Sequence, residues 1–257
     1  MKAKFNNYFS IGQAILAAAL FGMSAPFSKL LLAEISPLML SALLYIGAGI
    51  GMLVIDSIRR LSKAKLVEAR LTKKELPFIL LMLVLDIAAP IFLMIGLTIT
   101  TSSNAALLNN FEIVATSIVA LIVFKEAIGS RLWLSIILIT ISSIILSVED
   151  FSSFSLSTGS IFVLLATIFW GFENNCTRKL SIKDPLQIVI IKGLGSGLGA
   201  LIIAFSAQQV FWNTSYIALA LILGFFAYGM SILFYVSAQR HLGAARTSAY
   251  YAVAPFI

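Results

Sequence analysis

Four ionisable side chains lie within long apolar runs of the sequence, where they could bind a substrate or move a proton. They are Asp86, Glu112, Glu173 and Lys192. A charge near the centre of a bilayer costs roughly 2.5–3.5 kcal/mol on insertion scales, so each group needs a partner, a water-filled cavity or a proton. We therefore expect the chemistry of this chain to depend on these positions.

Glu112 is the strongest candidate for a substrate-binding or proton-coupling group. It lies near the middle of the apolar run 102–124. If this run is one helix, Asn109 lies on the same face three residues earlier, and Asn110 adds a second amide. The alternative is a protonated Glu112 that hydrogen-bonds a neighbouring helix and serves only packing.

Glu173 begins a second cluster of the same composition, in the apolar run 159–177. Asn174 and a further asparagine follow it directly. The two clusters belong to different halves of the chain, and we expect the fold to bring them together around a central cavity. The alternative is that Glu173 pairs with Arg178 or Lys179 near the end of the same run.

Asp86 and Lys192 each allow more than one interpretation. Asp86 lies four residues before Pro90, and a proline removes a helical hydrogen bond and kinks the helix. Asp86 therefore marks either a hinge beside a cavity or a structural contact with another helix. We expect the long side chain of Lys192 to reach the inner interface; the alternatives are an ion pair with a carboxylate and a substrate contact.

Aromatic residues are candidates for the apolar wall of a pocket, with lipid contact or helix packing as the alternative. They are Trp170, Tyr228, Tyr250 and Tyr251. The single Cys176 excludes an intramolecular disulfide and a cysteine-based metal site. No H-E-x-x-H, G-x-S-x-G or G-x-x-x-x-G-K-[ST] motif occurs. We therefore expect no enzyme activity, no metal and no other cofactor.

The composition indicates that these groups lie in a membrane. Apolar residues make up 60% of the 257 residues and charged residues only 11%, whereas a soluble domain carries roughly 25% charged residues. The net charge of +7 does not indicate nucleic-acid binding, because Lys and Arg fall in short gaps between apolar runs. The chain is predicted to be an all-α integral membrane protein.

Nine apolar runs are predicted to be membrane-spanning helices, since backbone groups cannot stay unpaired in hydrocarbon. They are residues 11–33, 38–58, 77–99, 102–124, 132–148, 159–177, 186–206, 215–237 and 242–257. The last run is short, so we expect a tenth span after Ile257. All but two of the 18 Lys and Arg residues fall on the side of the N-terminus, which predicts a cytoplasmic N-terminus. The two exceptions are Lys29 and Lys192.

The sequence contains an internal repeat, and one complete repeat unit holds five predicted spans. Phe21-Gly22 returns as Trp170-Gly171, Pro37 returns as Pro185, and glycines 47, 49 and 51 return as glycines 195, 197 and 199. Because five is odd, the second copy enters the membrane from the opposite side. We expect two inverted repeats, residues 1–150 (spans one to five) and 151–257 (spans six to nine, with the tenth missing), and a substrate site near the midplane between them.

Glycines 47, 49 and 51 in span two, and glycines 195, 197 and 199 in span seven, form what we call the glycine ladders. They are predicted to let helix backbones approach closely, with a sliding surface as the alternative. The two copies also differ. Ser24 in the first corresponds to Glu173 in the second, and Pro26 corresponds to Asn175. We expect the function to depend on these differences.

Several features are shared with a known family: Phe21-Gly22 with Lys29, Trp170-Gly171 with Arg178, the small residues of 104–108 and 246–250, and Glu126. On these, the chain resembles the EamA-like family of the drug/metabolite transporter superfamily. It departs from the family pattern where Glu112-Ile113 replaces Glu-Pro and Lys125 replaces Gly. The resemblance implies a ten-helix, inverted-repeat carrier of small metabolites.

These observations predict a secondary active transporter of the cytoplasmic membrane that moves a small metabolite by alternating access, with proton-coupled efflux as one mode. Its partners would be the metabolite, the lipid bilayer and protons, with no nucleic acid and with a homodimer left open. The alternative is a lipid or polyprenyl-carrier translocase that uses Lys192, Arg178 and Lys179. A membrane enzyme or interaction subunit is a third interpretation.

Overall fold

The computed structural model describes residues 2–62, 69–125, 127, 129–150 and 155–257; Glu126 lies outside them. Its α-helices are α1 (Lys2–Gly22), α2 (Ser24–Leu31), α3 (Pro37–Leu61), α4 (Leu76–Ile99), α5 (Ser102–Leu108), α6 (Phe111–Phe124), α7 (Ser130–Ser147), α8 (Thr158–Leu180), α9 (Pro185–Ser206), α10 (Thr214–Leu223), α11 (Ser231–Leu242) and α12 (Ala244–Tyr251). Shorter elements are η1 (Lys73–Glu75), the π-helical turn η2 (Gly224–Met230) and η3 (Ala254–Phe256).

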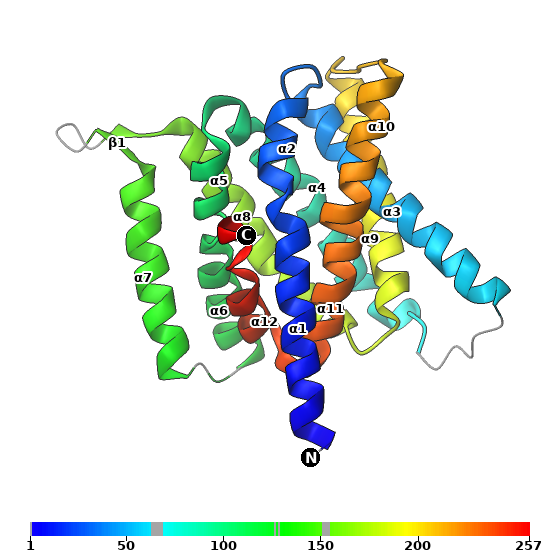
Figure 1. Ribbon diagram of the computed structural model, residues 1–257, viewed down its shortest axis with the longest axis vertical. Helices are drawn as coiled ribbons and strands as arrows, with labels where there is room; N and C mark the ends of the chain where they lie inside the picture. The colour runs from blue at the N-terminus through cyan, green and yellow to red at the C-terminus, as the bar shows by residue number, and fades with distance from the viewer. Residues whose placement is uncertain (1, 63–68, 126, 128, 151–154) are drawn as a thin grey trace.

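The helices form one upright bundle (Figure 1). In the view of Figure 1, α1 and α2 follow one another along its height beside α10 and α11, and α7 stands at its edge. Strands β1 (Val148–Asp150) and β2 (Ser155–Leu156) pair antiparallel between α7 and α8, where the sequence predicted only a connection.

Six helical segments of the described chain are long and apolar enough to cross a membrane. They are Asn7–Leu31, Pro37–Leu61, Lys73–Ile99, Ser102–Phe124, Pro185–Ser206 and Thr214–Leu242. Of the other predicted spans, α7 is shorter (Ser130–Ile145 by the same criterion), and α8 carries the polar cluster that begins at Glu173. The structure thus confirms a helical, multi-pass membrane protein.

Corresponding caps begin the second span of each predicted repeat. Ser36 and Asp184 are the N-caps of α3 and α9, and their side chains accept hydrogen bonds from the backbone N–H groups of Met39 and Leu186. A proline follows each cap at the first helical position, where no N–H is needed. The sequence signal at Pro37 and Pro185 is therefore a local helix start in both copies.

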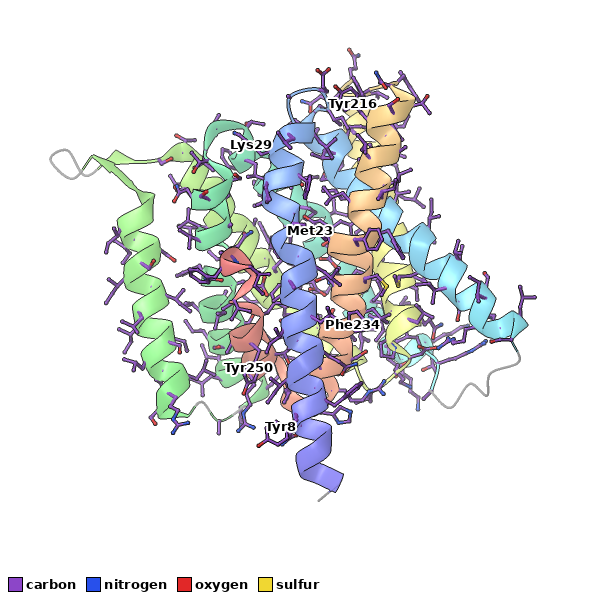
Figure 2. All side chains as sticks on the ribbon, in the orientation of Figure 1. Tyr8, Met23, Lys29, Tyr216, Phe234 and Tyr250 are labelled. Atoms are coloured by element: carbon purple, nitrogen blue, oxygen red, sulfur yellow. The ribbon has the colours of Figure 1, made fainter. Side chains whose placement is uncertain are left out.

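Three predicted spans are interrupted. The ninth, predicted over 242–257, consists of the short helix α12, which ends at Tyr251, and η3, so the expectation of one helix there was wrong. The first breaks at Met23, three residues before Pro26. Because proline has no backbone N–H, Pro26 cannot donate a hydrogen bond to the preceding helical turn. Figure 2 shows Met23 midway along the bundle. The fourth breaks at Asn109-Asn110, between α5 and α6, where the backbone N–H groups of Asn110 and Glu112 bond to the carbonyl three residues back and not four. The expectation of one continuous helix over 102–124 was wrong.

Lys29 joins the outer end of the predicted first span to α4 by hydrogen bonds. Its ammonium donates hydrogen bonds to the backbone oxygens of Leu97, Thr98 (3.3 Å) and Thr100 (2.8 Å), at the C-terminal end of α4. Those carbonyls have no partner within their own helix and carry its negative dipole end, so a cation is stabilising there. Figure 2 shows Lys29 near the end of the bundle opposite Tyr8.

Gly49 and Gly197 of the glycine ladders, together with Gly193, place backbone against backbone between α3 and α9. A Cβ atom added to Gly193 would lie 2.4 Å from the backbone nitrogen of Gly49, and one added to Gly197 would lie 2.7 Å from that of Ile46. Atoms at such distances overlap, so no side chain fits at this crossing. The prediction of a packing surface is confirmed.

We expect Gly193→Val to destabilise the protein by about 3 kcal/mol, because the added methyl groups meet rigid backbone and not a movable side chain. The matched control is Gly12→Val on α1, where an added Cβ has no neighbour within 4 Å. Thermal unfolding in detergent should show a lowered Tm for Gly193→Val only. Equal Tm values for both variants would contradict the close packing.

Candidate functional site

A cavity lies among the helices, with an empty volume of about 400 Å³ when the open space at its mouth is included. Helices α1, α3, α6, α8, α9, α11 and α12 and the turn η2 all contribute to its wall, so it joins residues far apart in the sequence. Its lining residues are Phe21, Tyr45, Glu112, Trp170, Glu173, Asn174, Lys192, Tyr228, Ile232, Tyr235 and Tyr251. Most of them are aromatic, and the ionisable groups other than the tyrosines are two carboxylates and one ammonium.

One buried ammonium forms ion pairs with two buried carboxylates. Lys192 Nζ lies 2.9 Å from Glu173 Oε2 and 3.3 Å from Asp86 Oδ2. The three side chains are 5%, 1% and 0% exposed, respectively. The expectation that Lys192 reaches the inner interface was wrong: the low dielectric makes two unpaired carboxylates costly, and the ammonium turns inward to compensate them.

The alternative pairing of Glu173 with the basic residues at the end of its own helix is not found either. Thr177, one turn further along α8, donates its hydroxyl to Glu173 Oε1. Arg178 donates to the hydroxyl of Ser181 at 3.4 Å, and the ammonium of Lys179 lies over the ring of Phe124. These longer side chains point away from the carboxylate because neither is three or four residues from it.

Asp86 contacts two other helices directly and a third through Tyr45. Tyr45 Oη of α3 donates to Asp86 Oδ1 at 3.0 Å, and Trp170 Nε1 of α8 in turn donates to Tyr45 Oη at 3.4 Å. With the contact to Lys192 on α9, this confirms a partner for Asp86 on other helices. Helix α4 continues as one element through Pro90, so no break accompanies this acid.

The two predicted carboxylate–asparagine clusters meet. Asn174 Nδ2 donates to Glu112 Oε1 at 2.6 Å and also to the hydroxyl of Thr116 at 3.2 Å. This contact needs α6 and α8 to lie very close, and Gly171 permits it: a Cβ added there would lie 2.4 Å from the Cβ of Ala115. The sequence correctly placed the two clusters next to each other.

Glu112 lies at the junction of two cavities. A second cavity, with an empty volume of about 360 Å³, is lined by Glu112 together with Asn109 and Asn110, and it shares Phe21 and Tyr251 with the first. Glu112 is only 8% exposed, and no ion pair of its carboxylate is found in the described part of the chain. The two asparagines thus share a cavity with Glu112 and lie in the turn between α5 and α6, and not on one continuous helix with it.

The predicted aromatic wall is partly right. Trp170, Tyr228 and Tyr251 line the first cavity, whereas Tyr250 does not and is 37% exposed. The sequence analysis missed Phe21 as a wall residue. The signal was present in the repeat, because Phe21 corresponds to Trp170, and the two rings meet edge to face at 6.1 Å.

Tyr45 and Tyr235 were also missed. Tyr45 lies two residues before the glycine ladder of α3, where the helices come closest, and this proximity would have marked it as an interior residue. Tyr235 has no comparable signal, since the apolar run around it does not show which face points inward.

Apolar helices around a cavity lined by buried charges define a multi-pass membrane protein with an internal cavity. The family model of the EamA-like transporter family matches residues 9–148 and 157–257, and the chain therefore belongs to this family. It is 29% identical over 261 residues to a protein described as an uncharacterized transporter from Methanothermobacter thermautotrophicus, a match that covers 94% of this chain and 74% of that protein.

The fold is also found among solved structures. One, described only as the crystal structure of a protein, superimposes with a TM-score of 0.69 over 97% of this chain and 84% of the other, at 11% identity. At such low identity the likeness concerns the fold alone. The family membership and the relative make this chain a membrane transporter with a small-molecule substrate.

We expect Lys192→Met to destabilise the protein by about 3–5 kcal/mol, because it leaves Asp86 and Glu173 buried without their cation. The control Lys179→Met removes an exposed ammonium at the end of α8 and should leave the Tm in detergent nearly unchanged. Adding Glu173→Gln to Lys192→Met should recover part of the loss. No recovery would contradict the shared pairing.

Proposed function

We propose that this transporter is a secondary active carrier of the cytoplasmic membrane that binds a small metabolite between two inverted halves, residues 1–150 and 151–257, and works by alternating access. The observation that carries the proposal is the contact of Glu112 from the first half with Asn174 from the second, at the wall of an interior cavity. A ligand bound there touches both halves, so its binding can favour one arrangement of them over the other.

Helix packing supports the inverted repeat. Helix α4, the third span of the first half, packs along α8, the first span of the second. The corresponding pair, α11 and α1, also packs together. The glycine ladders agree: Gly47 of α3 faces Leu221 of α10, and Gly195 of α9 faces Leu83 of α4. Each ladder helix thus contacts the third span of the opposite half, as a two-fold relation in the membrane plane requires.

Proton coupling is proposed for Glu112, with Glu173 as the second acid of the predicted site. Lys192 and Thr177 bind Glu173, whereas an amide and no cation binds Glu112 among the described residues. A carboxylate in low dielectric without a cation is stable when it carries a proton or a cationic ligand, and the exchange of one for the other would couple transport to the proton gradient.

The lipid-translocase alternative loses support from the pairing of Lys192. It needs a lateral opening lined by basic residues, and the ammonium of Lys192 is instead enclosed by two acids. The aromatic wall of the cavity is better suited to a small, partly apolar solute.

We expect purified protein in proteoliposomes to show counterflow with at least one member of a metabolite panel. Glu112→Gln should lower proton-driven transport at least tenfold and remove its dependence on pH, because an amide cannot take up the proton. The exposed Glu34→Gln is the matched control and should transport normally. Normal transport with unchanged pH dependence in both Glu112→Gln and Glu173→Gln would contradict the coupling.

A cytoplasmic N-terminus predicts opposite accessibility for two exposed loop positions. In a Cys176→Ser background, Ala207→Cys should react with a membrane-impermeant maleimide in intact cells, since Ala207 follows α9 on the predicted outer side. Ser62→Cys, which follows α3, should react only after the cells are opened. Labelling of Ser62→Cys in intact cells would reverse the orientation.

A further inference from the structure

The polar atoms of the aromatic wall are bound to the protein and not left for a ligand. Tyr45 Oη donates to Asp86, Trp170 Nε1 donates to Tyr45, and Tyr228 Oη accepts a hydrogen bond from Ser24 at 3.1 Å. These hydrogen bonds hold in place three of the rings that line the cavity.

The two tyrosines on the other side of the cavity follow the same rule. The hydroxyl of Tyr235 lies 2.6 Å from that of Ser248, and the hydroxyl of Tyr251 lies 3.1 Å from that of Ser231. Phe21 joins the two sides, with its ring 5.7 Å from that of Tyr228 and 5.3 Å from that of Tyr251. Electron-rich ring faces attract cations, most strongly where water is excluded.

The charges around the cavity also favour a cation. Asp86 and Glu173 share the ammonium of Lys192, while Glu112 has only the amide of Asn174. Counting Asp86, which pairs with Lys192 but does not itself line the cavity, three carboxyl groups stand against one ammonium. A protonated Glu112 offers an anionic ligand no charge to pair with, whereas a ligand with one positive charge can replace that proton and balance the carboxylate.

Asn109 indicates which kind of cationic ligand would fit the site. Its side-chain oxygen is buried and has no hydrogen-bond partner among the described residues, and it lines the second cavity together with Glu112. An unpaired buried acceptor on a residue that lines the same cavity as a carboxylate fits a ligand that brings N–H donors. A protonated primary amine supplies both the charge and the donors, and a quaternary ammonium supplies only the charge.

We propose that the site recognises small arylalkylamines in their protonated form, with the ammonium between Glu112 and Asn109 and the aromatic body against the rings of the first cavity. This assignment of a substrate class rests on the proposed function, since it places the ligand where alternating access needs it. It excludes aromatic carboxylates, and it predicts that a neutral analogue of the same shape binds more weakly.

The fluorescence of one tryptophan of the chain can report ligand binding in the cavity. Of its three tryptophans, Trp170 is buried in the cavity wall, while Trp133 and Trp212 are 42% and 76% exposed. In the full-length double variant Trp133→Phe, Trp212→Phe, purified in detergent, fluorescence reports on Trp170 alone. Titrations at pH 7 would use 2-phenylethylamine, 2-phenylethanol and 3-phenylpropionate as the cationic, neutral and anionic probes.

We expect 2-phenylethylamine to bind at least tenfold more tightly than 2-phenylethanol, and 3-phenylpropionate to give no saturable change. Glu112→Gln in the reporter background should weaken amine binding at least tenfold and leave alcohol binding unchanged, which also shows that the variant is folded. Glu34→Gln should bind like the parent. Equal or tighter binding of the carboxylate, or full amine affinity in Glu112→Gln, would overturn the proposal.

Asn109→Leu tests the donor argument separately. It should weaken 2-phenylethylamine several-fold and leave benzyltrimethylammonium, which has no N–H, unaffected; equal loss for both would overturn the role of Asn109. Because these titrations need no vesicles, the two proposals can fail independently. Amine binding without transport would overturn the carrier, and counterflow of other metabolites without amine binding would overturn the amine site.

Discussion

The sharing of one ammonium by two buried carboxylates is the constraint on which the rest of the interior depends. Lys192 on α9 joins Glu173 on α8 to Asp86 on α4, and Asp86 in turn fixes Tyr45 on α3. Breaking one partner of such a set strands a charge in low dielectric, so the four helices must keep their relative positions near the cavity. The ring of Tyr45, and through it that of Trp170, is oriented by the same requirement.

Features with a local physical cause could be predicted from the sequence. Pro37 and Pro185 follow capping side chains and begin helices in both copies, and the repeated glycines mark the contact of α3 with α9. The meeting of Glu112 with Asn174 followed from the expectation that the two halves enclose a cavity. In each case a short pattern implied one geometry.

What failed depended on the direction of single side chains. The composition around Lys192 is compatible with an ammonium that reaches the interface and with one that turns inward, and only the positions of Asp86 and Glu173 decide between them. The turn at Asn109-Asn110 was missed because an apolar run does not show where hydrogen bonding within it stops. Tyr235 was missed because lipid and interior select similar residues for opposite helix faces.

The glycine crossing has a mechanical consequence. Side chains in an ordinary helix contact can change rotamer and absorb a small displacement, but at Gly49 and Gly193 the backbones themselves touch. Helices α3 and α9 therefore form a rigid pair that cannot shift at this crossing without an overlap of backbone atoms. In the alternating access proposed above, the cavity would open and close through elements that move around this pair of helices, and the breaks at Met23 and at Asn109-Asn110 are places where two such elements are already interrupted.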